Sequence, residues 1–185
     1  MKTSLTLLMA SASFCLAGDN NGFNMTSLVQ TSENPVYHEQ EFNLSVFGSG
    51  EYGRGTGKGV DNDFFGVGLE GQCFLKQIGP VQLGASASAW LNDATHIQGS
   101  FVDNARVTLV GRIPIGISGV ALFGEAGEGY DFEVTRLRYE YAGGGVEFRS
   151  RYNWSFYLSM GFNWSIGNED FDSYPSSRAG FRFVF

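Results

Sequence analysis

From about residue 41 to its C-terminus, the chain alternates between apolar and polar positions with a period of two. This period is typical of β-strands that have one apolar and one polar face. The clearest segment is 153–166, where the apolar positions are Trp154, Phe156, Leu158, Met160, Phe162, Trp164 and Ile166. The pattern predicts eight strands, at about 41–50, 63–75, 81–91, 105–113, 119–127, 138–149, 153–166 and 178–185.

The connections between these segments alternate in length. Long polar connections are expected at about 51–62, 92–104, 128–137 and 167–177, and short ones at about 76–80, 114–118 and 150–152. Outer-membrane barrels have short turns at one end and long loops at the other, and about ten residues suffice for a tilted strand to cross the bilayer. The sequence therefore predicts an all-β fold over residues 41–185, a single antiparallel up-and-down transmembrane β-barrel of eight strands.

The volume of the side chains indicates which face meets lipid. An eight-stranded barrel has little room inside, and the bulky apolar set of segment 153–166 would overfill it. We therefore expect the apolar face to point outward, with Trp154 and Trp164 in the aromatic girdles near the headgroups. For the sixth strand the same reasoning sets Tyr139 and Tyr141 on the lipid face.

The charged side chains of the strands then fall on the inner face. An arginine at the bilayer midplane would cost about 2–4 kcal/mol if it faced lipid, so we expect these residues to pair inside the barrel. For Arg112, Arg138 and Arg178, a place in headgroups or water at the strand ends is an equal alternative. The expected lumen ion-pair residues are Glu70, Arg106, Arg112, Glu125, Arg138, Glu140, Arg178 and Arg182.

The N-terminal part reads differently from the rest. Residues 1–18 combine Lys2, a short apolar run and small residues, which indicates a signal peptide. Residues 19–40 have no sustained period and are expected to form a flexible periplasmic lead-in. Once the signal peptide is removed, Cys73 is the only cysteine, so a disulfide framework within the chain is excluded.

Composition and charge narrow the class of protein. The 26 Gly, 17 Phe and 8 Tyr, with only 4 Pro, suit a curved sheet and not a disordered chain. The formal charge of −7, without a basic tract, argues against binding to nucleic acid.

The C-terminal residues Phe181, Phe183 and Phe185 are similar to the terminal signature of outer-membrane barrel proteins. This resemblance implies recognition by the barrel-assembly machinery. As a whole, the alternating chain resembles the transmembrane domains of OmpA and OmpX-like proteins. That resemblance implies a place in the bacterial cell outer membrane, in contact with its lipids and lipopolysaccharide.

Residues suited to catalysis or metal binding are few. His96 and Ser100 form the only pair that fits an outer-membrane lipid-modifying enzyme, and a solvated loop is the simpler interpretation. The acidic group Glu169, Asp170 and Asp172 fits a solvated loop better than a divalent-cation site with lipopolysaccharide phosphates. His38 lies in the lead-in without a neighbouring ligand set. We expect no metal, no cofactor and no catalysis.

The sequence thus predicts a structural and surface-interaction role for a barrel that displays four extracellular loops. The pattern does not identify the ligand of these loops. The alternatives are a narrow pore or small-ligand carrier, a lipid-modifying enzyme, and a soluble lipocalin-like carrier.

Overall fold

The computed structural model describes residues 40–55, 61–92, 103–115, 119–132, 138–166 and 173–185. The expected signal peptide and nearly all of the lead-in lie outside these residues. The described elements are the strands β1 (Glu41–Gly55), β2 (Asp61–Ile78), β3 (Val81–Asn92), β4 (Asn104–Pro114), β5 (Val120–Asp131), β6 (Arg138–Arg149), β7 (Trp154–Ser165) and β8 (Tyr174–Val184). Within the described chain, no helix is long and apolar enough to cross a membrane.

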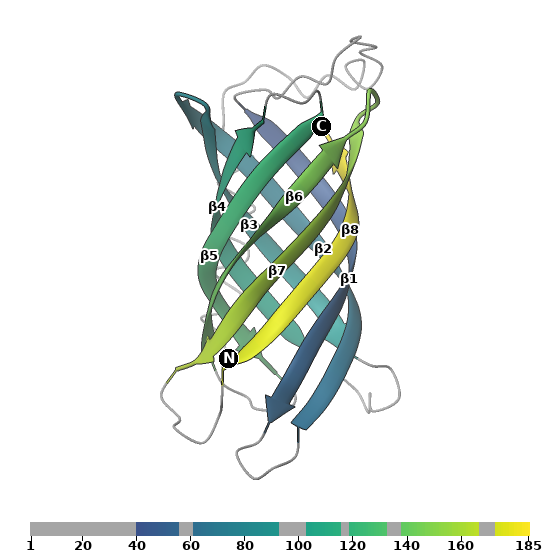
Figure 1. The fold of residues 1–185 in the computed structure, drawn as a ribbon, viewed down its shortest axis with the longest axis vertical. Helices are drawn as coiled ribbons and strands as arrows, with labels where there is room; N and C mark the ends of the chain where they lie inside the picture. Colours follow the sequence, from purple (N-terminus) through teal and green to yellow (C-terminus); the bar gives the residue numbers. More distant parts are fainter. Residues whose placement is uncertain (1–39, 56–60, 93–102, 116–118, 133–137, 167–172) are drawn as a thin grey trace.

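The strands form one closed antiparallel barrel in which each strand pairs with the next along the chain, and β8 pairs with β1 (Figure 1). The β1–β8 pairing sets Ser45 opposite Arg182 and Val46 opposite Phe181, and closes the sheet without a free edge. The predicted eight-stranded up-and-down barrel is confirmed.

The two ends of the barrel differ. At the turn end, β8 finishes and the connections 79–80, 115–119 and 150–153 join neighbouring strands. The tightest of them is Gly79–Pro80, where Gly79 has a φ of 59°. This left-handed backbone favours glycine, while the proline ring holds its own φ negative. The other end, where β1 joins β2, β3 joins β4, β5 joins β6 and β7 joins β8, is called the loop end below.

One expected loop is mostly strand. β1 and β2 have 15 and 18 residues, so the sheet continues through most of the stretch predicted as a long connection at 51–62. Only residues 56–60 separate the two strands. Here β1 and β2 continue as a two-stranded hairpin: Gly55 is still paired with Asp61, whereas the β1–β8 pairing ends at Glu51 and the β2–β3 pairing begins at Gly66. Polar residues do not end a strand whose backbone groups are still hydrogen-bonded to a neighbouring strand.

The outer wall is apolar over most of its height. Leu109 is 75% exposed, Met160 is 70% exposed and Val67 is 65% exposed. Trp154 and Trp164 lie on this wall, 39% and 40% exposed, at the two ends of β7. Such a surface is a large apolar patch in water, but it matches the solvent of a bilayer.

The lumen contains aromatic rings as well as polar groups. Phe47, Trp90, Phe123 and Tyr157 are all buried, and the inner wall makes room for rings by carrying glycines. A Cβ at Gly161 would lie 2.4 Å from a ring carbon of Tyr141. Glycine at such positions lets a ring lie flat against the sheet.

The orientation expected for β6 is wrong. Tyr139 and Tyr141 are buried in the lumen, whereas Arg138 and Glu140 face outward. The apolar face of β6 is formed by Val146 and other residues of its parity, at the turn end of the strand. Tyrosine is ambiguous in such a pattern, because its ring can line the lumen when a partner accepts its hydroxyl proton.

Candidate functional site: an ion-pair chain in the lumen

Alternate residues of six strands bring charged side chains into the middle of the barrel. The pleat points them inward, and an eight-stranded lumen is narrow enough for side chains from opposite walls to meet. Four of these residues are glutamates and five are arginines. They are Glu41 of β1, Glu70 of β2, Arg106 and Arg112 of β4, Glu125 of β5, Glu147 and Arg149 of β6, and Arg178 and Arg182 of β8.

The chain of ion pairs begins near the turn end. Arg149 donates to Glu41 at 2.6 Å, and the same carboxylate accepts from Arg112 at 2.8 Å. Arg112 also reaches Glu147, at 3.3 Å, and its Nε donates to the side-chain oxygen of Gln82 at 2.9 Å. Every charged group in this part of the lumen therefore has an opposite charge within hydrogen-bonding distance.

The same chain continues through the centre of the barrel. Glu147 accepts from Arg182 at 3.0 Å, and Arg182 also reaches Glu70 at 3.2 Å. Glu70 accepts from Arg178 at 2.8 Å, and Arg178 is also paired with Glu125. Ion pairs thus run without a break from Arg149 near the turn end to Glu125, and they link β1, β2, β4, β5, β6 and β8.

On the loop-end side of the chain, aromatic rings accompany the charges. The Tyr141 hydroxyl donates a hydrogen bond to Glu125 Oε1, with an O–O distance of 2.9 Å. The guanidinium of Arg106 lies over the Tyr141 ring, 3.6 Å from its centroid, and 5.2 Å from that of Trp90. Cation–π contacts of this kind stabilise an arginine that has left bulk water.

This arrangement fills the lumen and crosslinks the walls. Buried ion pairs contribute little net stability when formed, because desolvation offsets their attraction, but removing one partner costs about 3–5 kcal/mol. Because these side chains from six strands meet across the axis and are buried, protein atoms occupy the lumen at their level. Among the described residues, no group of three or more His, Cys, Asp or Glu is placed to hold a metal ion.

The structure brings together most of the expected lumen residues and separates two of them. Glu70, Glu125 and Arg182 lie in the chain of ion pairs, and so do Arg112 and Arg178. Arg106 lies beside the chain, over the ring of Tyr141. Arg138 and Glu140 are not in the lumen, and their assignment to it is wrong. Arg138 instead pairs with Glu128 on the outer wall, with side chains 61% and 56% exposed.

Three residues of the chain were missed by the sequence reasoning, namely Glu41, Glu147 and Arg149. Glu147 and Arg149 alternate in step with Tyr139. Because Tyr139 was expected on the lipid face, the orientation predicted for β6 gave these two residues no place in the lumen. The alternation of Val146 and Phe148 with these charges was the signal that pointed to the correct orientation.

The aromatic residues proposed for assembly lie at the outer wall near the seam. Phe181, Phe183 and Phe185 are exposed, and the Phe185 backbone N–H donates to the Phe42 carbonyl at 2.8 Å. The last residue is thus tied to the first strand. The residues His38, His96, Ser100, Glu169, Asp170 and Asp172 lie outside the described part of the chain.

Comparison with known proteins agrees with this architecture. No protein-family model matches the sequence, and no curated protein matches it. The structure is similar to the crystal structure of Ail, the attachment invasion locus protein of Yersinia pestis, with a TM-score of 0.54 and 15% identity over 80% of this chain and 100% of that chain. For Ail in complex with the heparin analogue sucrose octasulfate, the TM-score is 0.52 and the identity 13%, over 80% of this chain and 100% of that chain. For Neisserial surface protein A (NspA), the TM-score is 0.52 and the identity 10%, over 78% of this chain and 97% of that chain.

At these identities the likeness shows the fold. Together with the closed eight-stranded sheet, it shows that this chain has the fold of the small bacterial outer-membrane β-barrels, and the apolar outer wall suits the lipid bilayer in which barrels of this fold lie.

Proposed function

We propose that the protein is a non-catalytic outer-membrane anchor, whose rigid barrel holds the connections of its loop end at the cell surface. The observation that carries this proposal is the unbroken chain of ion pairs from Arg149 to Glu125. Because charged side chains meet across the described part of the lumen, we place the function of the barrel in what its two ends present.

The asymmetry of the ends supports the orientation. Short connections, such as Gly79–Pro80, lie at the turn end together with the end of β8. In outer-membrane barrels the short turns face the periplasm and the longer connections face outward. In the proposed orientation, residues 56–60, 93–103, 132–137 and 166–173 therefore connect strands on the cell surface.

Surface labelling tests this orientation. An epitope inserted after residue 97 should be labelled by antibody on intact cells, because this position belongs to the loop end. The matched control carries the same epitope between Gly79 and Pro80, and it should be labelled only after the outer membrane is permeabilised. The reverse pattern would overturn the orientation.

Conductance tests the closed lumen. The purified full chain, reconstituted in planar bilayers, should give no stable single-channel steps. As a control, Arg178→Ala and Arg182→Ala together remove the two cations at the centre of the chain and shorten both side chains. This variant should conduct if it folds, which heat-modifiable migration on a gel would show. Steps from the unaltered protein would instead favour a narrow pore.

The proposed surface ligand differs from that of one structural neighbour. Ail has been crystallised with a sulfated heparin analogue. The present chain has a formal charge of −7, and Glu169, Asp170 and Asp172 fall within one of its loop-end connections. Repulsion between like charges makes a sulfated polymer a poor fit, so a neutral or cationic surface partner is the better expectation.

For assembly, we propose that the C-terminal aromatic residues are read by the barrel-assembly machinery. Phe185 is already hydrogen-bonded to Phe42 across the seam, so the same strand edge would be open before the barrel closes. Removal of Phe185 should slow the appearance of folded barrel in cells more than it slows refolding of the purified chain in detergent. Equal slowing in both would argue against recognition.

A further inference from the structure

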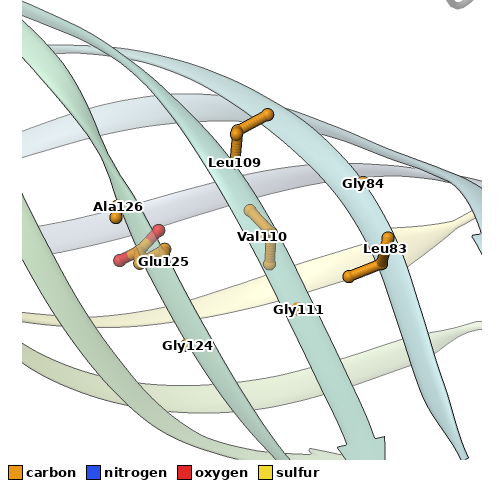
Figure 2. Close-up of a pocket in the computed structure, with 8 residues that line it drawn as sticks. All are labelled: Leu83, Gly84, Leu109, Val110, Gly111, Gly124, Glu125 and Ala126. Atoms are coloured by element: carbon orange, nitrogen blue, oxygen red, sulfur yellow. The ribbon is translucent and has the colours of Figure 1, made fainter.

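The outer wall of the barrel has two unlike halves. The walls of β7, β8, β1 and β2 carry most of the large aromatic side chains. The walls of β3 to β6 carry mainly Ala, Gly, Val and Leu, with Tyr130 and Phe148 near their ends. On this second half lies a groove of about 360 Å³, lined by Leu83, Gly84, Leu109, Val110, Gly111, Gly124, Glu125 and Ala126 (Figure 2).

The floor of the groove is not required by packing within the barrel. Gly111 and Gly124 are paired in register and both face outward. A Cβ at Gly124 would find its nearest neighbour 3.8 Å away, and one at Gly111 would also meet only ordinary contacts, at 3.8 and 3.9 Å. At Gly161 on the inner wall, by contrast, a Cβ would collide with Tyr141 at 2.4 Å.

A projecting side chain lies beside the groove at a similar height. Leu109, which is 75% exposed, is two residues from Gly111 along β4, so it lies about 5 Å nearer the loop end on a strand tilted by about 35–45°. Because of the same tilt, Gly124, the residue of β5 that is paired with Gly111, lies about 3 Å nearer the loop end than Gly111 does (Figure 1). Leu109 and Gly124 therefore lie at about the same height on neighbouring strands.

Charges of both signs mark the same half of the wall at its loop-end rim. Arg138 is paired with Glu128, and Glu128 is opposite Glu140 in the β5–β6 register. The structure shows no ion pair between Glu140 and another described residue. Two like charges directly opposite each other repel, so the rim has an acidic group suited to a cation from outside the chain.

We propose that the β3–β6 wall is the contact face of a homodimer, with two copies side by side in the membrane. A two-fold axis along the membrane normal brings together points of equal height on opposite sides of the axis. With the axis near β5, Leu109 of each copy enters the groove at Gly124 of the other. At the rim, Arg138 of each copy comes near Glu140 of the other, so one surface carries both complementary charges.

The size of the residues suits this contact. Two barrels approach most closely along one line, where the small side chains of Gly124 and Ala126 allow their backbones to come close, as small residues do between membrane helices. Beside that line the curved walls separate, and a larger side chain such as Leu109 fills the widening gap. Lipid acyl chains are as apolar as this wall, so hydrophobicity alone does not favour the dimer over lipid. The fit between the two protein surfaces therefore decides whether the copies associate.

Disulfide crosslinking tests the dimer directly. In the full chain with Cys15 and Cys73 replaced by alanine, Ala126→Cys should form a disulfide-linked dimer when copper phenanthroline is added to lipid vesicles at low protein density. The matched control is Ala179→Cys, which is also an outward-facing alanine but lies on β8, in the opposite half of the wall. It should stay monomeric. Equal crosslinking at both positions, or none at Ala126→Cys, would overturn the proposal and leave lipid as the cover of this wall.

A second pair of variants tests the groove. Gly124→Leu should abolish the crosslink at Ala126→Cys, because its side chain fills the site that Leu109 of the other copy occupies. Gly48→Leu is the control, since Gly48 also faces outward and a Cβ there has its nearest neighbour at 3.8 Å. Both variants should keep the heat-modifiable migration of a folded barrel. A crosslink that survives Gly124→Leu would refute the contact through the groove. Because the crosslink does not depend on which end faces outward, its outcome is separate from that of the epitope test.

Discussion

The replacement Glu125→Leu tests whether the ion-pair chain holds the barrel together. Glu125 is 5% exposed, is paired with Arg178 and accepts the hydroxyl proton of Tyr141. Without it, Arg178 keeps only Glu70, and the tyrosine hydroxyl loses its partner inside the lumen. Removing one member of a buried ion pair costs about 3–5 kcal/mol. Because Arg178 retains one carboxylate, we expect a loss of about 3 kcal/mol, near the lower end of that range.

Urea unfolding of the protein from lipid vesicles, followed by tryptophan fluorescence, measures this loss. With a typical slope of about 1–3 kcal/mol per M, a loss of about 3 kcal/mol lowers the midpoint by roughly 1–3 M. Arg151→Leu is the control, because Arg151 is exposed at the turn end and lies outside both the ion-pair chain and the proposed dimer face. Its midpoint should stay the same or rise.

A double-mutant cycle separates the pair from the individual side chains. Arg178→Met alone should also be destabilising, because it removes the cation that lies between Glu70 and Glu125 and leaves their negative charges to repel each other. The double variant Glu125→Leu, Arg178→Met should lose less than the sum of the two single losses, since it leaves no unpaired charge between the two positions. An unchanged midpoint for Glu125→Leu, or strictly additive losses, would refute the role given to the network.

Three further outcomes follow from the positions of single residues. A variant that keeps Trp164 as its only tryptophan should be quenched by brominated lipids, whereas one that keeps only Trp90, which is 3% exposed in the lumen, should not; equal quenching would contradict the inward placement. Gly161→Val should lower stability by about 1–3 kcal/mol through overpacking, and Gly48→Val should not, as measured by the same urea titration. Gly79→Ala should cost about 1–2 kcal/mol because its φ of 59° disfavours a Cβ, and an unchanged midpoint would show that this turn adjusts freely.

The sequence alone determined the class of fold and the orientation of most strands. In β7 the contrast between Trp, Phe, Leu and Met on one parity and Ser, Gly and Asn on the other is large, and period-two patterns translate directly into faces of a sheet. Volume then decided which face is outside. The inward placement of Glu70, Glu125 and Arg182 follows from the same reasoning, because it depends only on the parity of each residue within its own strand.

The partners of these charges were decided only by the tertiary structure. Strand parity cannot show that Arg178 lies between Glu70 and Glu125, because that depends on closure of the sheet, its stagger and the reach of side chains across the lumen. The orientation of β6 was also decided there, since Tyr141 has a ring that suits lipid and a hydroxyl that suits Glu125. Its ring fits inside only because Gly161 on the neighbouring strand has no side chain, and a pattern read along one strand does not contain that space.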